Sequence, residues 1–344
     1  VLPGMWRCCV RRRGARRCLV VAQSLPDAES GGLQLVNDQY PMFVVRASVL
    51  IEMTRIEAHQ VLRRTGVVIE LPAFARDIAI FVSHQWCGRR HADRHFRQLG
   101  VLQAVFVRAA SGSLAVQTDL LSAVIDQRKP SVTAADLRSV NSWVMWYDYF
   151  SVPQPLAPEA ESCQHFDLNE DLGKAVASLP SYVQACRFFV VLAPTVAHED
   201  GHLIDYASWK QRCWCRLERI ARVLSHAETH ILQIRLPDMI FEVGPNEYLF
   251  EPVGWGALSF EGDRERLGPL LERLVARKLV QLRDSGRHEE FRRLLSWCPS
   301  MLRGLPADWK HACPHPGEAW QMDAVEAFAH LAAVQGSSRL LASD

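Results

Sequence analysis

The chain has 344 residues, of which 49% are hydrophobic and 22% are charged, with a formal net charge of +1. This length suits two domains, or one domain with long extensions, and the composition excludes a mostly disordered or low-complexity chain. The balance of 39 Lys and Arg against 38 Asp and Glu argues against a dedicated binder of duplex nucleic acid. The longest purely apolar runs, such as 188–194, have the length of a strand, so we expect no membrane-spanning helix.

The N-terminus departs from this even balance of charge. Residues 1–17 contain six arginines and no acidic residue, and residues 20–40 are rich in Ser, Gly, Asp and Gln. An Arg-rich, acid-poor segment is typical of a transit peptide or of a solvated tail. We expect residues 1–40 to be a disordered basic tail and linker without chemistry of its own. Because the sequence starts at Val1, Met5 is an alternative start.

Ten cysteines are spread over the chain without regular spacing. In a chain of this length they are too few for a disulfide framework, and free thiols are typical of a reducing compartment. We therefore expect a cytoplasmic protein.

Four short apolar runs, at 78–83, 143–148, 188–193 and 230–235, have the length and residue types of strands. Each is rich in β-branched or aromatic residues and hydrophobic almost throughout, as in a parallel strand that is covered on both faces. Helical periodicity fills the gaps between them, at 96–106, 172–183, 209–224 and 267–282. Ser208 is placed to cap the third of these helices, and Gly286 ends the fourth.

Strands that alternate with helices over 78–285 predict an α/β fold: a three-layer, flavodoxin-like parallel sheet flanked by helices. A polar insertion at 111–140 precedes the second strand. We expect an N-terminal helical extension at 41–77, with one helix over 43–66, and a C-terminal helical extension at 286–344. The latter would hold two helices separated by the loop 304–318. In such sheets ligands bind beyond the carboxyl ends of the strands.

One helix that follows the third strand carries an aromatic residue and a carboxylate four positions apart, Trp214 and Glu218, which places them on one face. An indole beside a carboxylate suits a flat cationic ring attached to a sugar, because the carboxylate opposes positive charge that develops at the sugar carbon. The alternative is that Glu218 is a solvated residue paired with Arg222 at i,i+4 while Trp214 covers the sheet.

The residues 206–218, Tyr-Ala-Ser-Trp-Lys-Gln-Arg-Cys-Trp-Cys-Arg-Leu-Glu, resemble the Tyr/Ser…Trp-Cys-x-x-Glu signature of Toll/interleukin-receptor (TIR) domains. Neighbouring pieces follow in the family's order: a strand ending in Phe-Val-Ser-His at 81–84, a strand ending in Asp148, and an approach to the third strand at 179–193. The resemblance covers about 78–235. It is to the outer branches of the superfamily, among incompatibility-type and uncharacterised protist proteins, since His84-Gln85-Trp86 and the insertion depart from the usual pattern.

This resemblance implies a candidate activity, because many TIR domains hydrolyse NAD⁺ with the Glu of Trp-Cys-x-x-Glu as the catalytic residue. Glu218 is then the candidate catalyst, stabilising an oxocarbenium-like transition state while nicotinamide leaves. NAD⁺ would be the substrate, with no cofactor permanently bound. The residues implied to line its site are Ser83, His84, Trp86, Arg89, Asp148, Tyr149 and Trp214.

A second hypothesis is a non-enzymatic signalling or assembly module, because TIR-like folds commonly associate with copies of themselves or with other TIR-like domains. Neither hypothesis needs nucleic acid or a membrane.

We expect no metal site. Cys213 and Cys215 with His198 and His202 suggest zinc, but helical residues two apart point about 200° away from each other. A Cys–His nucleophilic pair of Cys215 with His198 or His84 is also open.

Overall fold

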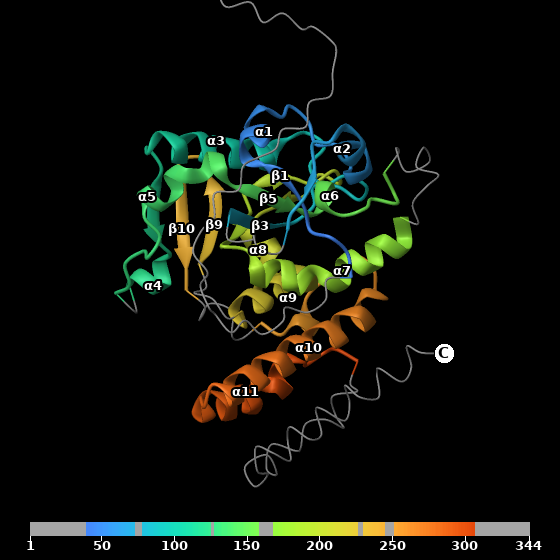
Figure 1. The fold of residues 1–344 in the computed structure, drawn as a ribbon, viewed down its shortest axis with the longest axis vertical. Helices are drawn as coiled ribbons and strands as arrows, with labels where there is room; N and C mark the ends of the chain where they lie inside the picture. The colour runs from blue at the N-terminus through green and yellow to red at the C-terminus, as the bar shows by residue number, and fades with distance from the viewer. Residues whose placement is uncertain are drawn as a thin grey trace, which may run out of the picture. The chain divides into compact units, whose positions relative to one another are not determined.

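The computed structural model describes residues 39–72, 78–124, 127–157, 168–225, 230–244 and 251–306. Its centre is an eight-stranded sheet with the strand order β2-β1-β5-β3-β6-β9-β10-β4 (Figure 1). The strands are β1 Phe43–Arg46, β2 Ile69–Glu70, β3 Ala79–His84, β4 Ala115–Thr118, β5 Val144–Tyr147, β6 Phe188–Leu192, β9 Ile231–Leu236 and β10 Met239–Val243.

The middle of the sheet is the parallel unit that the sequence predicts. Strands β5, β3, β6 and β9 are parallel neighbours in that order, which is 2-1-3-4 in the order of the chain. This is the flavodoxin-like order, in which the direction of strand addition reverses between β3 and β6. All four predicted strands are confirmed, and every residue of β3, β5 and β6 is buried.

The edges of the sheet come from segments that the sequence analysis places elsewhere. The single helix expected over 43–66 is wrong, because these residues form β1, α1 (Ala47–Glu52) and α2 (His59–Thr65). β1 pairs antiparallel with β5 through Val45 and Arg46 and with β2 through Phe43 and Val44, and its apolar run at 43–45 is buried. At the other edge β10 pairs antiparallel with β9, and β4 from the insertion lies parallel to β10.

Helices cover both faces of the sheet, which makes the three layers of the predicted fold (Figure 1). α3 (Arg97–Ser111) packs with α1 and α5 (Ala134–Leu137), whereas α7 (Leu168–Ala185) and α9 (Cys213–Val223) pack together and contact β3. α10 (Asp263–Asp284) packs on α7 and α9, and α11 (His288–Met301) packs on α10. The short elements are α4 Leu120–Val124, η2 Arg138–Ser142, α6 Asp148–Ser151, β7 Val196–Ala197, β8 Leu203–Ile204, α8 Tyr206–Lys210 and η5 Val253–Trp255.

The helix ends follow from single residues. α3 is followed by Gly112 and α10 by Gly286, which have φ of 73° and 70°, in the left-handed region that glycine tolerates best. Gly286 ends the long helix as predicted. One hydrophobic cluster joins the sheet to both extensions, from Tyr40 to Leu305. Residues 1–38 of the expected tail and linker (1–40) and the second C-terminal helix lie outside the described residues, whereas Tyr40 is buried in the core.

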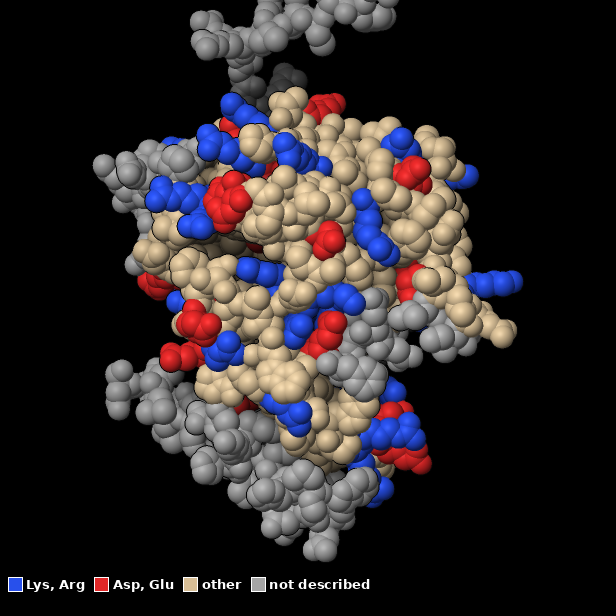
Figure 2. Space-filling model, turned by 180° about the vertical axis from the view of Figure 1, so that it is seen from behind, with Lys and Arg blue, Asp and Glu red and all other residues tan. Residues whose placement is uncertain are grey.

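No helix among the described residues is long and apolar enough to cross a membrane. On the face drawn in Figure 2, positive and negative side chains are interspersed over the described part of the chain. The predictions that nucleic acid and membranes are not partners stay predictions.

Besides the pairing of β4, a buried carboxylate fastens the insertion to the sheet. Glu242 of β10 accepts hydrogen bonds from the Ser131 hydroxyl at 2.5 Å and from the backbone N–H groups of Ser131 and Val132 at 2.6 and 3.0 Å. Burial alone would raise the pKa of Glu242, but these hydrogen bonds hold it below its ordinary value of 4.5. The carboxylate form therefore stabilises the fold above pH 4.5.

We predict that Glu242→Gln lowers the free energy of unfolding by about 2 kcal/mol at pH 7, because a charge-assisted acceptor is lost while the N–H groups of Ser131 and Val132 remain. Urea unfolding followed by circular dichroism measures this. Glu261→Gln is the control, since the Glu261 side chain is 82% exposed. Equal stability of wild type and Glu242→Gln at pH 7 would contradict this role.

Candidate functional site

The candidate site lies at the carboxyl end of β3, where the order of the parallel strands reverses. Ser83 and His84 are the last two residues of β3, and Asp148 follows β5 directly. Because successive side chains of a strand point to opposite faces, Ser83 faces the α9 layer and His84 the other. The site therefore has one group of side chains on each face of the sheet, and both groups reach the same edge.

The group on the α9 side consists of Glu218, Ser83 and Trp209. The Ser83 hydroxyl donates to Glu218 Oε2 at 2.5 Å, and the indole N–H of Trp209 donates to Ser83 Oγ at 3.1 Å. The three side chains come from α9, β3 and α8. A chain of two hydrogen bonds thus joins the two helices to the end of the strand.

Glu218 is not the solvated helical residue of the alternative interpretation. Glu218 of α9 is only 9% exposed. Arg222 does not serve as its partner, because its guanidinium donates to the backbone carbonyls of Cys186 and Arg187, both at 2.6 Å. Within the described part of the chain, the hydrogen-bond partner of the Glu218 carboxyl is Ser83, and no Lys or Arg forms an ion pair with it.

Burial makes the Glu218 carboxyl a weak acid. The pKa is raised from 4.5 to about 8, chiefly by desolvation; the Ser83 hydrogen bond acts to lower it, and the negative charge of Asp148 adds to the increase. At neutral pH the protonated form predominates. A carboxyl group with a pKa this close to neutrality is typical of functional sites, where a group must change its charge during the reaction.

The group on the other face is built around Asp148. Its two carboxylate oxygens accept from His84 Nε2 at 2.8 Å and from the indole N–H of Trp86 at 2.6 Å. The His84 ring stacks on Tyr147 with centroids 4.0 Å apart. Nδ1 of His84 is buried and has no hydrogen-bond partner within the described residues. The structure therefore brings together three of the predicted site residues here: His84, Trp86 and Asp148.

Tyr149 joins the edge of this group, whereas Arg89 lies outside it. The buried Tyr149 ring packs edge-on against Trp86 at 5.6 Å. Arg89 is 76% exposed, and its guanidinium lies 3.3 Å from Asp200.

Trp214 contacts a different element from Glu218. Its indole N–H donates to Asp263 of α10 at 2.9 Å, so it helps to hold α10 against α9. Glu218 meets β3 instead. Placing both residues on one face of a helix is thus not sufficient to bring their polar groups to one site.

Sequence reasoning missed the aromatic residue that does reach the site, Trp209, because it expected one helix over 209–224. The structure has a break after Lys210, with α8 before it and α9 after it. Ser208 does not cap a long helix. It is the third residue of α8 and forms a reciprocal capping box with Asp205. This break turns Trp209 toward Ser83, and no periodicity in the sequence indicates it.

The two cysteines of this segment are packing residues. Cys215 lies against the site, with its thiol 3.8 Å from the carbonyl oxygen of His84. Burial raises the pKa of Cys215 well above its ordinary value, and it also raises that of Cys213. A thiol that is held protonated is a poor nucleophile, so a Cys215 nucleophile is not supported. Among the described residues, neither cysteine belongs to the group of potential metal ligands around His198 and His202.

Comparison with known proteins adds no further constraint, since no protein-family model, no curated protein and no solved structure matches the chain.

We predict that Glu218→Gln stabilises the protein at neutral pH, because Gln keeps the acceptor for Ser83 but carries no ionisable proton. With a folded pKa of about 8 and an ordinary value of 4.5, the folded chain holds a proton that the unfolded chain has lost between these pH values. Wild-type stability therefore falls with rising pH over this interval, by about 1.4 kcal/mol per pH unit. Thermal or urea unfolding of both proteins at pH 5, 6, 7 and 8 measures the difference.

The gain from Glu218→Gln should grow from pH 5 to pH 8. Glu289→Gln is the matched control, since the Glu289 side chain is 80% exposed on α11. A constant difference between wild type and Glu218→Gln across this range would show that Glu218 titrates at an ordinary pKa.

Proposed function

We propose that the chain is a TIR-like NAD⁺ glycohydrolase in which Glu218 is the catalytic carboxylate. The observation that carries the proposal is a carboxyl group, 9% exposed and without a cationic partner among the described residues, at the strand-order reversal of a flavodoxin-like sheet. This is the position at which such sheets bind nucleotides. The resemblance of residues 206–218 to the TIR signature supplies the reaction class.

The raised pKa of Glu218 explains why a cationic substrate suits this position. A buried carboxylate is unstable without an opposite charge, and a unit positive charge 4 Å away supplies about 4 kcal/mol at an effective dielectric constant of about 20. The nicotinamide ring of NAD⁺ and the ribose carbon attached to it carry such a charge. A bound substrate would therefore favour the ionised form of Glu218 before the bond to nicotinamide breaks.

The reaction breaks the bond between the ribose C1′ and the ring nitrogen of nicotinamide. The bonding electron pair goes to that nitrogen, which neutralises the pyridinium, so no strong general acid is required. Glu218 opposes the positive charge that develops at C1′. A water oxygen then bonds to C1′ and releases a proton, which gives ADP-ribose. The Asp148 carboxylate, which is 30% exposed, is positioned at the same edge to accept a proton.

The first test incubates the full chain at high concentration with NAD⁺ and measures released nicotinamide by chromatography. Wild type should release it, and Glu218→Gln should lose at least about a hundredfold in rate because transition-state charge stabilisation is lost. Glu289→Gln should keep the wild-type rate. Equal release by wild type and Glu218→Gln would refute the assignment of Glu218.

The pH dependence tests the role of the ionised carboxylate. We predict that kcat/KM rises with pH through a midpoint of about 8, the pKa of Glu218 in the free protein. Ser83→Ala removes the hydrogen bond that lowers this pKa, so its midpoint should move to higher pH. A pH-independent kcat/KM between pH 6 and 9 in wild type, with activity present, would contradict this mechanism.

The assembly module remains the second candidate for the TIR-like fold, and the nicotinamide assay separates the two. Folded wild-type protein that releases no nicotinamide at any concentration would favour assembly with itself or with other TIR-like domains. Glu218 would then act only as a buried structural carboxyl.

A further inference from the structure

A short hairpin connects β6 to α8 and carries three potential metal ligands. β7 and β8 pair antiparallel with Ala197 opposite Leu203, so His198 stands opposite His202, and the two share a backbone hydrogen bond of 2.8 Å. Residues 199–201 form the loop, with Gly201 at a φ of 88°. Directly opposed residues of a hairpin lie on the same face with their Cβ atoms about 5 Å apart. The backbone therefore fixes the two imidazoles side by side.

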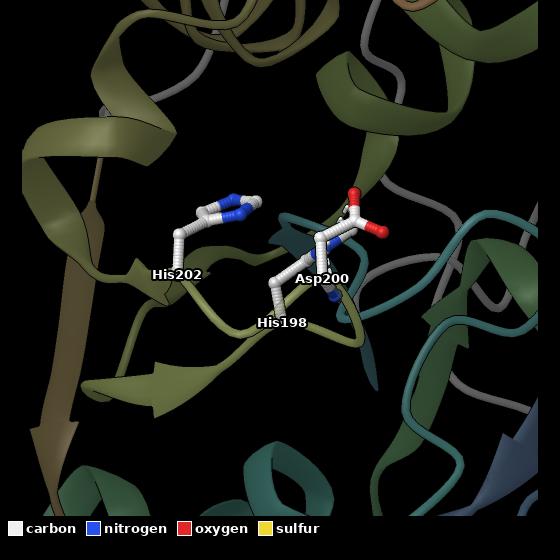
Figure 3. A group of neighbouring side chains, drawn as sticks. All are labelled: His198, Asp200 and His202. Carbon is white, nitrogen blue, oxygen red and sulfur yellow. Dashed lines mark hydrogen bonds and ion pairs between the residues drawn. The ribbon is translucent and has the colours of Figure 1, made fainter.

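Asp200 at the tip of the loop completes the group. One ligand atom from each of His198, Asp200 and His202 lies within 4.8 Å of the other two. Figure 3 shows the three side chains rising from the same side of the hairpin, with His198 and Asp200 in contact. The two imidazole rings are nearly parallel, with centroids 4.5 Å apart.

The distance between His198 and Asp200 already suits a shared ion. Nδ1 of His198 lies 3.4 Å from Oδ2 of Asp200. Two ligand bonds of about 2.0–2.1 Å at a tetrahedral angle separate their ligand atoms by about 3.3 Å, which is the geometry of zinc. Nδ1 also accepts the backbone N–H of Asp200 at 3.2 Å, so a metal ion bound at Nδ1 would replace this hydrogen bond. An unprotonated imidazole nitrogen is the form that binds a metal.

The hairpin is held in place independently of these three side chains. The backbone N–H of Glu199 donates to the carbonyl of Cys87 at 2.8 Å, and the Glu199 carboxylate accepts the backbone N–H of Arg89 at 2.7 Å. The Arg89 guanidinium lies 3.3 Å from Asp200, but it is 76% exposed. Such an exposed ion pair contributes little, so a divalent cation can displace it.

We propose that His198, Asp200 and His202 bind one divalent transition-metal ion, with zinc the best fit to two imidazoles and one carboxylate. Three protein ligands leave a coordination position open for water or an anionic oxygen. The sequence analysis paired these histidines with Cys213 and Cys215 and expected no metal. In the structure the third potential ligand is Asp200, which the loop of the hairpin places beside the two histidines.

The test loads the chelator-stripped full chain with zinc chloride, removes excess zinc by dialysis and measures bound zinc by mass spectrometry. Wild type should retain one zinc ion per chain more than His198→Ala/His202→Ala. Calorimetric titration with zinc should show at least about a tenfold loss of affinity for Asp200→Asn. Mutating a residue that only hydrogen-bonds to a metal ligand already costs about tenfold in affinity, and Asp200 is itself a ligand. Cobalt in place of zinc should give a visible absorption band in wild type that the double variant lacks.

Two controls keep the result specific. His288→Ala removes an exposed histidine of α11 and should retain zinc as wild type does. Arg89→Ala leaves the three ligands and removes the competing cation, so it should bind zinc at least as tightly. Circular dichroism without zinc checks that every variant is folded. Equal zinc content in wild type and a folded double variant would overturn the proposal, because any retained zinc would then be bound elsewhere.

Discussion

The hydrogen bond from Ser83 to Glu218 is the interaction on which the candidate site depends. It crosses from the end of the first parallel strand to α9, and Trp209 extends it to α8. The carboxyl group is thereby kept at the strand-order reversal and away from water. Its burial raises its pKa to about 8, so the neutral form predominates at neutral pH and the charged form takes over at higher pH. A small change in nearby charge is sufficient to change its state.

This balance connects the stability of the fold to the proposed chemistry. Ionising Glu218 in the free protein costs stability, and a cation beside it offsets that cost. In the proposed reaction, the same physical effect would favour a substrate with positive charge at the reacting carbon. The hairpin that follows β6 leads directly into α8, so an ion on His198, Asp200 and His202 would fix the approach to Trp209 without touching Glu218.

The parallel unit could be predicted from the sequence because its strands are buried on both faces and read as continuous apolar runs. The edges could not. The run at 43–45 is too short to separate from the helical pattern after it, and β10 and the hairpin of β7 and β8 are strands of five and two residues. For the site, Ser83, His84, Asp148 and Glu218 follow from strand ends and the TIR resemblance. Trp209 and Asp200 depend on a helix break and a turn, which leave no periodic signal.

The most direct test of the account is the pKa of Glu218 itself. Carbon-13 NMR of protein labelled at the glutamate δ carbons, with Glu218→Gln to assign the signal, gives this value from a pH titration. The account predicts a midpoint of about 8 in the free protein and a lower midpoint when a non-hydrolysable, positively charged analogue of NAD⁺ saturates the site. A midpoint near the ordinary 4.5 in the free protein would contradict the central claim.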